Sequence, residues 1–371
     1  MKSRFLIIII VALAGACGTH RTTSPATMHA GTAGSTVSAS PLGENQILPP
    51  VPLTGVQELV SGSSHSCAVL QDKTVVCWGY GTNAFATPVA DLTKVKALAA
   101  GSGSTCALQE DGAVHCWGDN SSAQLGDGTR DDRTSPVRVR ELPPAKQIFL
   151  SSHKGCALDA EGLLRCWGNT GDLQGRIRVM EFERLSHLSM GSMHRCVTDT
   201  SGRVTCWGAT DNGRKHKRVM PLEPAVSTHL GVHHGCVLLN SGRVACWGNN
   251  RFGQCGAEEG LHHTEPVVVS GLGAILQLSV GHGHACGLTP ERTVRCWGAN
   301  DTGQLGDGKK EHRHSPVRVE ELDGVLRIAA GGAHTCALLD SKEVRCWGAN
   351  YSGQLGNGTM KQSAVPVLVT K

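Results

Sequence analysis

Seven copies of one cysteine motif constrain the fold more than any other feature of this chain. Each copy consists of a cysteine, nine residues, and then Cys-Trp-Gly, and this spacing never varies. All seven tryptophans directly follow the second cysteine of a pair. A motif that recurs over most of a chain indicates a repeat architecture with one structural unit per copy. The pairs are Cys67 with Cys77, Cys106 with Cys116, Cys156 with Cys166, Cys196 with Cys206, Cys236 with Cys246, Cys286 with Cys296, and Cys336 with Cys346.

Each repeat contains four short apolar stretches that are separated by turn residues. The first ends in a Gly or Ser turn, as in 95–101, the next two carry the cysteines, and the fourth follows a proline, as in 136–139. Short valine-rich runs between turns predict β-strands, and no stretch has a convincing helical period. Four antiparallel strands in each of seven repeats predict an all-β protein, a seven-bladed β-propeller.

The two middle strands of each repeat predict a hairpin, and the hairpin predicts a disulfide. Turn residues lie midway between the cysteines, as in 110–112 and 240–242, so pairing about this centre places the two cysteines opposite each other. We therefore expect one disulfide per blade. The alternative is zinc, but zinc ligands usually come as closer Cys-x2-4-Cys pairs. No metal and no cofactor are expected. Cys17 and Cys255 are left over.

The N-terminus has the features of an export signal. Lys2 and Arg4 precede an apolar run over 5–13, which is too short to span a bilayer. The sequence from Leu13 to Cys17 resembles the lipobox of bacterial lipoproteins, with Cys17 as the lipid-attachment residue; ordinary secretory cleavage is the alternative. Gly18 after the cysteine favours the outer membrane, by resemblance to enterobacterial sorting. Regular cysteine pairs also suit an oxidising compartment.

These observations predict three parts of the chain. Residues 1–16 are a lipoprotein signal peptide, residues 17–50 are a flexible Ser/Thr/Gly/Pro tether, and residues 51–371 are the propeller. The expected location is the cell envelope, with the protein exported and lipid-anchored to a membrane.

The loops after the tryptophans carry a family resemblance. Repeats six and seven read Gly-Gln-Leu-Gly-Asp-Gly at 303–308 and Gly-Gln-Leu-Gly-Asn-Gly at 353–358, each after Trp-Gly-Ala-Asn and before Pro-Val. Repeat two keeps this loop, repeat five has Cys255 in the leucine place, and repeats one, three and four are shortened. From about residue 55 to 371, the chain resembles the regulator of chromosome condensation repeat, a seven-bladed propeller family. The resemblance implies an interaction platform, because members of that family have differing partners.

The expected function is a non-enzymatic scaffold of the cell envelope that binds a protein or surface glycan through its propeller loops. A formal charge of +4 is too small to demand nucleic acid, and a monomer is expected. No Gly-x-Ser-x-Gly motif, phosphate loop or recurring acidic pair is present. The alternatives are a propeller lyase or hydrolase with an axial site and, by family label, guanine-nucleotide exchange, although an exported chain would not meet a cytosolic GTPase.

Several polar residues could carry chemistry, and each also has a structural explanation. Histidines stand two residues before five of the first cysteines, and they suggest either a metal or proton site or a turn hydrogen bond: His65, His194, His234, His284 and His334. Asp127, Asp307 and Asn357 suggest calcium or, more simply, turn formation. Cys255 is either a buried small hydrophobe or a reactive thiol.

The basic run in repeat four is the most distinctive feature outside the repeat pattern. Arg214, Lys215, Lys217 and Arg218 are expected in the shortened loop of that repeat. A solvated loop is the simpler interpretation of this run, and a contact for an anionic partner is the alternative.

Overall fold

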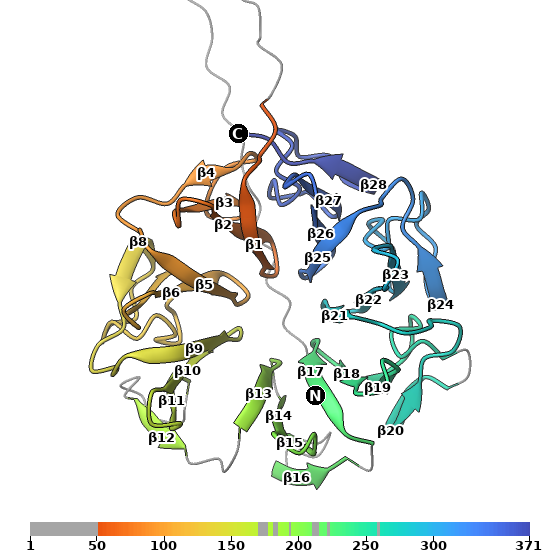
Figure 1. Ribbon diagram of the computed structural model, residues 1–371, viewed down its shortest axis with the longest axis horizontal. Coiled ribbons are helices and arrows are strands. Elements are labelled where there is room, and N and C mark those ends of the chain that lie inside the picture. The colour runs from red at the N-terminus through yellow and green to blue at the C-terminus, as the bar shows by residue number, and fades with distance from the viewer. Residues whose placement is uncertain are drawn as a thin grey trace, which may run out of the picture. The chain divides into compact units, whose positions relative to one another are not determined.

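The chain forms a ring of seven four-stranded antiparallel sheets (Figure 1). The computed structural model describes residues 51–371 without 170–176, 181–184, 193, 210–214, 221–222 and 258–259. In each blade the four strands are consecutive in sequence and consecutive in the sheet, with the first strand at the axis and the fourth at the rim. The prediction of a seven-bladed β-propeller is therefore confirmed.

The first three strands of every blade have four to six residues, whereas the fourth varies from two to seven. The first three blades are β1 (Val56–Ser61), β2 (His65–Leu70), β3 (Val75–Gly79) and β4 (Thr87–Pro88); β5 (Val95–Ala100), β6 (Ser104–Gln109), β7 (Val114–Gly118) and β8 (Arg133–Arg138); and β9 (Ala145–Leu150), β10 (Lys154–Asp159), β11 (Leu164–Gly168) and β12 (Arg178–Met180). The fourth and fifth are β13 (Leu185–Met190), β14 (His194–Asp199), β15 (Val204–Ala209) and β16 (Lys215–Val219); and β17 (Ala225–Leu230), β18 (His234–Leu239), β19 (Val244–Asn249) and β20 (His262–Val268). The last two are β21 (Gln277–Val280), β22 (His284–Leu288), β23 (Val294–Gly298) and β24 (Arg313–Arg318); and β25 (Val325–Ala330), β26 (His334–Leu339), β27 (Val344–Gly348) and β28 (Ser363–Leu368).

The cysteine pairs form one disulfide in every blade, as predicted. In each hairpin the two cysteines are direct partners in the register, as Cys236 and Cys246 are in β18 and β19. The seven pairs have Cα atoms 4.0 to 4.1 Å apart. From blade one to blade seven, the bonds join Cys67 to Cys77, Cys106 to Cys116, Cys156 to Cys166, Cys196 to Cys206, Cys236 to Cys246, Cys286 to Cys296, and Cys336 to Cys346.

The two remaining cysteines differ in what the structure says of them. Cys255 is buried and free. Cys17 lies outside the described residues, together with the predicted signal peptide and tether. Within the described part of the chain, no helix is long and apolar enough to cross a membrane.

Both faces of each sheet are buried because neighbouring blades pack face to face. This is why β18 and β26 are buried along their whole length and read as apolar runs without alternation. The tryptophans link successive blades: Nε1 of Trp167 donates to the carbonyl of Gln124, and Nε1 of Trp347 donates to that of Gln304, at 2.8 and 2.9 Å. These glutamines belong to the long post-tryptophan loops, at Gln-Leu-Gly.

The depth of each tryptophan follows the loop of the blade before it. The four that follow a blade with a long loop are at most 1% exposed: Trp78, Trp167, Trp297 and Trp347. Trp117 follows the shortened loop of blade one and is 7% exposed, while Trp207 and Trp247 follow shortened blades and are half-buried. The loop therefore acts as a cover for the next tryptophan.

The ring closes by contacts between its first and last blades rather than by a shared strand. Leu53 N donates to Val369 O at 2.9 Å, and Lys371 N donates to Val51 O at 2.8 Å. Nε1 of Trp78 donates to Gln354 O at 3.0 Å across the same junction. A short ladder of the two ends of the described chain thus holds the closed ring.

Candidate interaction face around the propeller axis

Two kinds of loop open on one face of the propeller. In an antiparallel blade, the turn between the first and second strands lies at the same end as the loop between the third and fourth. Hydrogen bonds confirm this placement: Tyr80 N donates to Ser64 O, and Ala299 N donates to Gly283 O, both at 2.8 Å. We call this end the turn face. The opposite end, the hairpin face, carries the short turns between the cysteines.

Glycines let the inner turns of the turn face approach the axis. A Cβ at Gly62 would collide with the carbonyl oxygen of Gly101 in the next blade, and a Cβ at Gly281 would collide with that of Gly331. The same collision with a neighbouring carbonyl recurs at Gly101, Gly231 and Gly331. At these positions only glycine leaves room for the neighbouring turn, and blade three has Ser151 in the equivalent place. The result is a narrow axial mouth.

The mouth leads into a small channel with a polar lip. The channel has a volume of about 110 Å³. At its lip, the hydroxyl of Ser63 is hydrogen-bonded to Nε2 of His282 at 2.9 Å. The hydroxyls of Ser102 and Ser152 are 2.6 Å apart, and that of Ser192 continues the chain at 3.4 Å from Ser152. Half-buried apolar side chains line the wall inside the lip: Leu150, Met190, Leu230 and Val280.

The repeated histidines bind neighbouring blades. Nε2 of His65 is hydrogen-bonded to Oγ1 of Thr105 in blade two at 2.8 Å, and Nε2 of His284 to Oγ1 of Thr335 in blade seven at 2.9 Å. His334 makes the same bond to Ser66 of blade one at 2.9 Å. The prediction of a hydrogen bond within the turn is therefore wrong. Each of these histidines instead bonds the side-chain hydroxyl of the residue that precedes the first cysteine of the next blade.

Burial keeps these imidazoles neutral. It lowers the pKa of His65 to about 4 and, together with the neighbouring histidines, lowers the pKa of His284 and His334 to about 3. His234 is equally buried, with a pKa of about 3, but neither of its ring nitrogens has a hydrogen-bond partner among the residues that the structure describes. The corresponding position in the next blade is Ala285, which has no hydroxyl. No cluster of metal-ligating side chains forms among the described residues.

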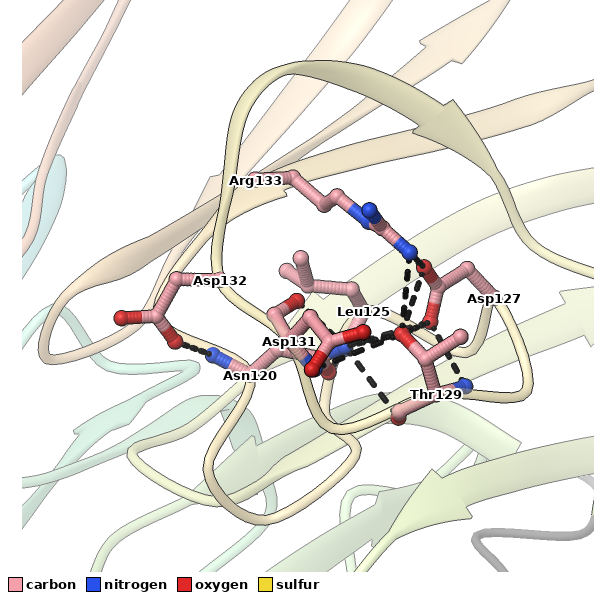
Figure 2. A network of polar contacts seen from close by, with 7 residues as sticks. All are labelled: Asn120, Leu125, Asp127, Thr129, Asp131, Asp132 and Arg133. Atoms are coloured by element: carbon pink, nitrogen blue, oxygen red, sulfur yellow. Dashed lines mark hydrogen bonds and ion pairs between the residues drawn. The ribbon is translucent and has the colours of Figure 1, made fainter.

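The long post-tryptophan loops are held by a buried asparagine (Figure 2). In blade two, Asn120 accepts from Leu125 N through Oδ1 at 3.0 Å, and its Nδ2 donates to Oδ1 of Asp127 at 3.1 Å. Asp127 also forms an ion pair with Arg133 at 2.9 Å and accepts bonds from Thr129. Although burial opposes it, these hydrogen bonds hold the pKa of Asp127 below its usual value.

The same arrangement recurs with Asn300, Asp307 and Arg313 in blade six. In blade seven, Oδ1 of Asn350 accepts from Leu355 N, and Nδ2 of Asn350 donates to Asn357, which takes the place of the aspartate. The polar contacts of Asp127 and Asp307 are made within their own loops and with the first residue of the strand that follows, which supports turn formation as the role of these residues.

The basic run lies in a strand, which corrects the expectation of a loop. Lys215, Lys217 and Arg218 belong to β16, the outer strand of blade four, which pairs with β15. Arg214 lies outside the described residues. The run therefore follows the rim of the propeller at an edge strand, where one backbone edge is free of its own sheet.

Cys255 has the environment of a structural residue. It is fully buried in the place that leucine occupies in the other long loops, and its thiol faces the carbonyls of Gly248 and Asn249. Burial raises the pKa of this thiol to about 12. Because the thiolate is the reactive form, the structure supports the buried small hydrophobe rather than the reactive thiol.

Exposed apolar side chains gather in the long and short post-tryptophan loops, a feature that sequence reasoning missed. Of the eleven large hydrophobic side chains that are exposed in the described chain, five lie in these loops: Tyr80, Phe85, Leu261, Tyr351 and Met360. The others lie in or beside strands or at the start of the described residues. The signal in the sequence was slight, since both tyrosines of the chain follow a Trp-Gly motif.

Fold and loops together define a disulfide-bonded repeat propeller whose variable surface is the turn face. Models of the regulator of chromosome condensation (RCC1) repeat match residues 111–158, 241–288, 293–338 and 343–371, and a second model of this repeat matches 56–84, 95–124, 226–254, 275–304 and 325–354. The chain belongs to the RCC1 repeat family. No curated protein sequence matches it.

Solved structures share the fold at low sequence identity. Prp20p from Saccharomyces cerevisiae, described with its binding to Gsp1p and histones, is 21% identical over 86% of this chain and 88% of its own, with a TM-score of 0.71. Human WBSCR16 is 19% identical over 78% and 85%, with a TM-score of 0.70. The CRINKLY WD40 ectodomain of the Arabidopsis thaliana receptor kinase ACR4 is 20% identical over 85% and 99%, at 0.53. At these identities the likeness concerns the fold alone.

Proposed function

We propose that this protein is a non-enzymatic interaction scaffold of a bacterial cell envelope, which binds a protein or glycan partner through its turn face. One observation carries the proposal. The loops that differ most in length between the repeats open on the turn face, and they hold five exposed large hydrophobic side chains. The hairpin face carries the turns between the cysteines and the connections between blades, which differ less in length and include the exposed Leu276. Variable loops on a rigid scaffold are where proteins place their binding residues.

The seven disulfides support an exported protein. Each lies fully inside a blade, and such a number of disulfides persists only where thiols are oxidised. The sequence before the propeller adds the anchor: we propose that Cys17 carries lipid and that the following segment tethers the propeller to the outer membrane. The protein acts as a monomer, without a nucleic-acid partner.

The anchor is tested at Cys17. Cys17→Ser removes the only thiol that can take the lipid in the lipobox-like sequence, so the protein should be released from membranes or left unprocessed. Metabolic labelling with a clickable fatty acid should mark the wild type and leave the variant unlabelled. Cys255→Ser should be labelled like the wild type. Equal labelling of Cys17→Ser and the wild type would refute the anchor.

Binding of an anionic partner is tested at the basic run. Changing Arg214, Lys215, Lys217 and Arg218 to Ser should weaken binding to lipopolysaccharide micelles at low salt and flatten its salt dependence, because surface attraction is screened within about 8 Å at physiological ionic strength. The measurement is a titration of the full chain at two salt concentrations.

A charge-matched control separates the basic run from net charge. It changes four exposed cations in the long loops to Ser: Arg251, Lys309, Lys310 and Lys361. The control should retain most of the binding. If both variants lose binding to the micelles equally, net charge is responsible for binding. If neither variant loses binding, the basic run is only solvated surface. The control should keep the wild-type unfolding midpoint, since its four positions are exposed and such substitutions cost little stability. The unfolding midpoint of the basic-run variant is measured beside it.

A further inference from the structure

The lining of the axial channel is uncharged, and Asp119, which lies beside the lip at Gly103, has its carboxylate bonded to Gln124 and to the backbone of Ser121. Among the described residues that line the channel, none is Asp, Glu, Lys or Arg. An ion that entered would lose hydration without gaining an opposite charge, which is unfavourable. The channel therefore favours a ligand group that is neutral.

The hydroxyls of the lip can both donate and accept hydrogen bonds. Ser102, Ser152 and Ser192 form one chain of contacts, and Ser63 contacts His282. Three hydroxyls in a chain use two hydrogens among themselves and keep one hydrogen and several lone pairs for a ligand. Such a lip complements groups that also do both, which are hydroxyl and amide groups.

An exposed aromatic ring stands beside this lip. Tyr80 is 63% exposed, and its Cε1 lies 4.0 Å from the place that a Cβ of Gly103 would take, directly after Ser102. Its backbone N donates to Ser64 O, directly after Ser63. Tyrosine offers an apolar ring face together with a polar end, which suits a ligand with one apolar and one polar side.

The size of the channel limits what can enter it. A volume of 110 Å³ corresponds to about four waters at about 30 Å³ each, well below the roughly 300 Å³ of a pocket for a whole small molecule. A hydroxymethyl or acetamido group fits this volume and would meet the apolar wall of Leu150, Met190, Leu230 and Val280. The ring that bears the group would remain at the lip, against Tyr80.

We propose that the axial mouth of the turn face binds the terminal sugar of a neutral glycan. Tyr80 stacks on the sugar ring, the serine hydroxyls and His282 bond its polar groups, and the exocyclic group enters the channel. The inference deepens the proposed function by naming the chemistry of one partner.

The test titrates the purified full chain with maltose, lactose and N,N′-diacetylchitobiose by calorimetry, up to about 10 mM, which is tenfold above a millimolar Kd. At least one disaccharide should bind. Tyr80→Ala should weaken that binding about tenfold, as the loss of one stacked ring predicts. Leu276→Ala is the matched control, because Leu276 is as exposed as Tyr80, at 63%, but lies between β20 and β21 on the hairpin face and should leave binding unchanged.

A second variant tests the hydroxyl lip without leaving a buried partner unpaired, because only the exposed hydroxyl of Ser192 loses a bond. Ser102→Ala with Ser152→Ala removes both members of one hydrogen bond, so the fold should be kept while sugar binding falls. No binding of any of the three sugars to the wild type overturns the inference, as does equal binding by the wild type and both lip variants. If sugars fail while a macromolecular partner is still captured by the turn face, only this inference fails and the proposed scaffold stands.

Discussion

Removing one disulfide should destabilise the propeller by about 3 to 5 kcal/mol. Cys336→Ala with Cys346→Ala removes the disulfide of blade seven, whose two cysteines are fully buried. The lost restraint on an unfolded loop of this length is about 2 to 3 kcal/mol, and two buried sulfurs lose their packing as well. The measurement is the free energy of unfolding in urea, followed by tryptophan fluorescence.

Cys255→Ala is the matched control for this prediction. It removes one fully buried sulfur that forms no disulfide, so it should cost only about 1 kcal/mol. A double variant no less stable than this control would contradict the role of the blade disulfides. Peptide mapping without reductant should find the other six links unchanged in the double variant.

Acidification should destabilise the propeller steeply between about pH 6.5 and pH 4. The folded pKa of His65 is about 4, and those of His234, His284 and His334 are about 3, because burial penalises the charged imidazole. An unfolded histidine takes up its proton near pH 6.5, so the unfolded state binds more protons than the folded state in this window. The free energy of unfolding therefore decreases as the pH is lowered. Above pH 6.5 these histidines are neutral in both states, and the stability of the propeller is no longer reduced by their protonation.

The slope of the free energy of unfolding against pH measures how many buried histidines contribute. Each of these four histidines contributes about 1.4 kcal/mol per pH unit in this window, and so do His187 and His229, whose pKa values burial lowers to about 4 and about 3. The six together give about 8 kcal/mol per pH unit at the steepest point. His284→Asn should reduce that slope by about one sixth, whatever its effect on stability at neutral pH. Urea unfolding at several pH values measures both. A flat stability between pH 6.5 and 4, or an unchanged slope in the variant, would contradict the neutral buried state.

Sequence spacing predicted the blades and their disulfides because both depend on contacts within a single repeat. Cys236 and Cys246 lie ten residues apart in one hairpin, so local pairing alone brings them together. The histidine partners could not be predicted in this way. The bond between His334 and Ser66 joins residues 268 positions apart, and it exists only because the ring closes.

The candidate site escaped prediction for the same reason. Ser63 and His282 are 219 residues apart and meet only at the axis. The basic run was wrongly predicted as a loop for a different reason. Lys215 to Arg218 have none of the apolar residues that mark a strand, yet their backbone pairs with β15 at the outer edge of the blade, where a side chain need not be buried.

Photo-crosslinking from the two faces tests the central claim most directly. A photoreactive residue replaces Met360 or Leu261 on the turn face, and Ser341 or Ser241 in the hairpins of the same two blades, in the full chain expressed in its own cells. All four positions are exposed, so reagent access is matched. The scaffold predicts adducts with a partner from the two turn-face positions and none above background from the two hairpins. Adducts of equal or greater yield from Ser341 and Ser241, or none from Met360 and Leu261, would contradict it.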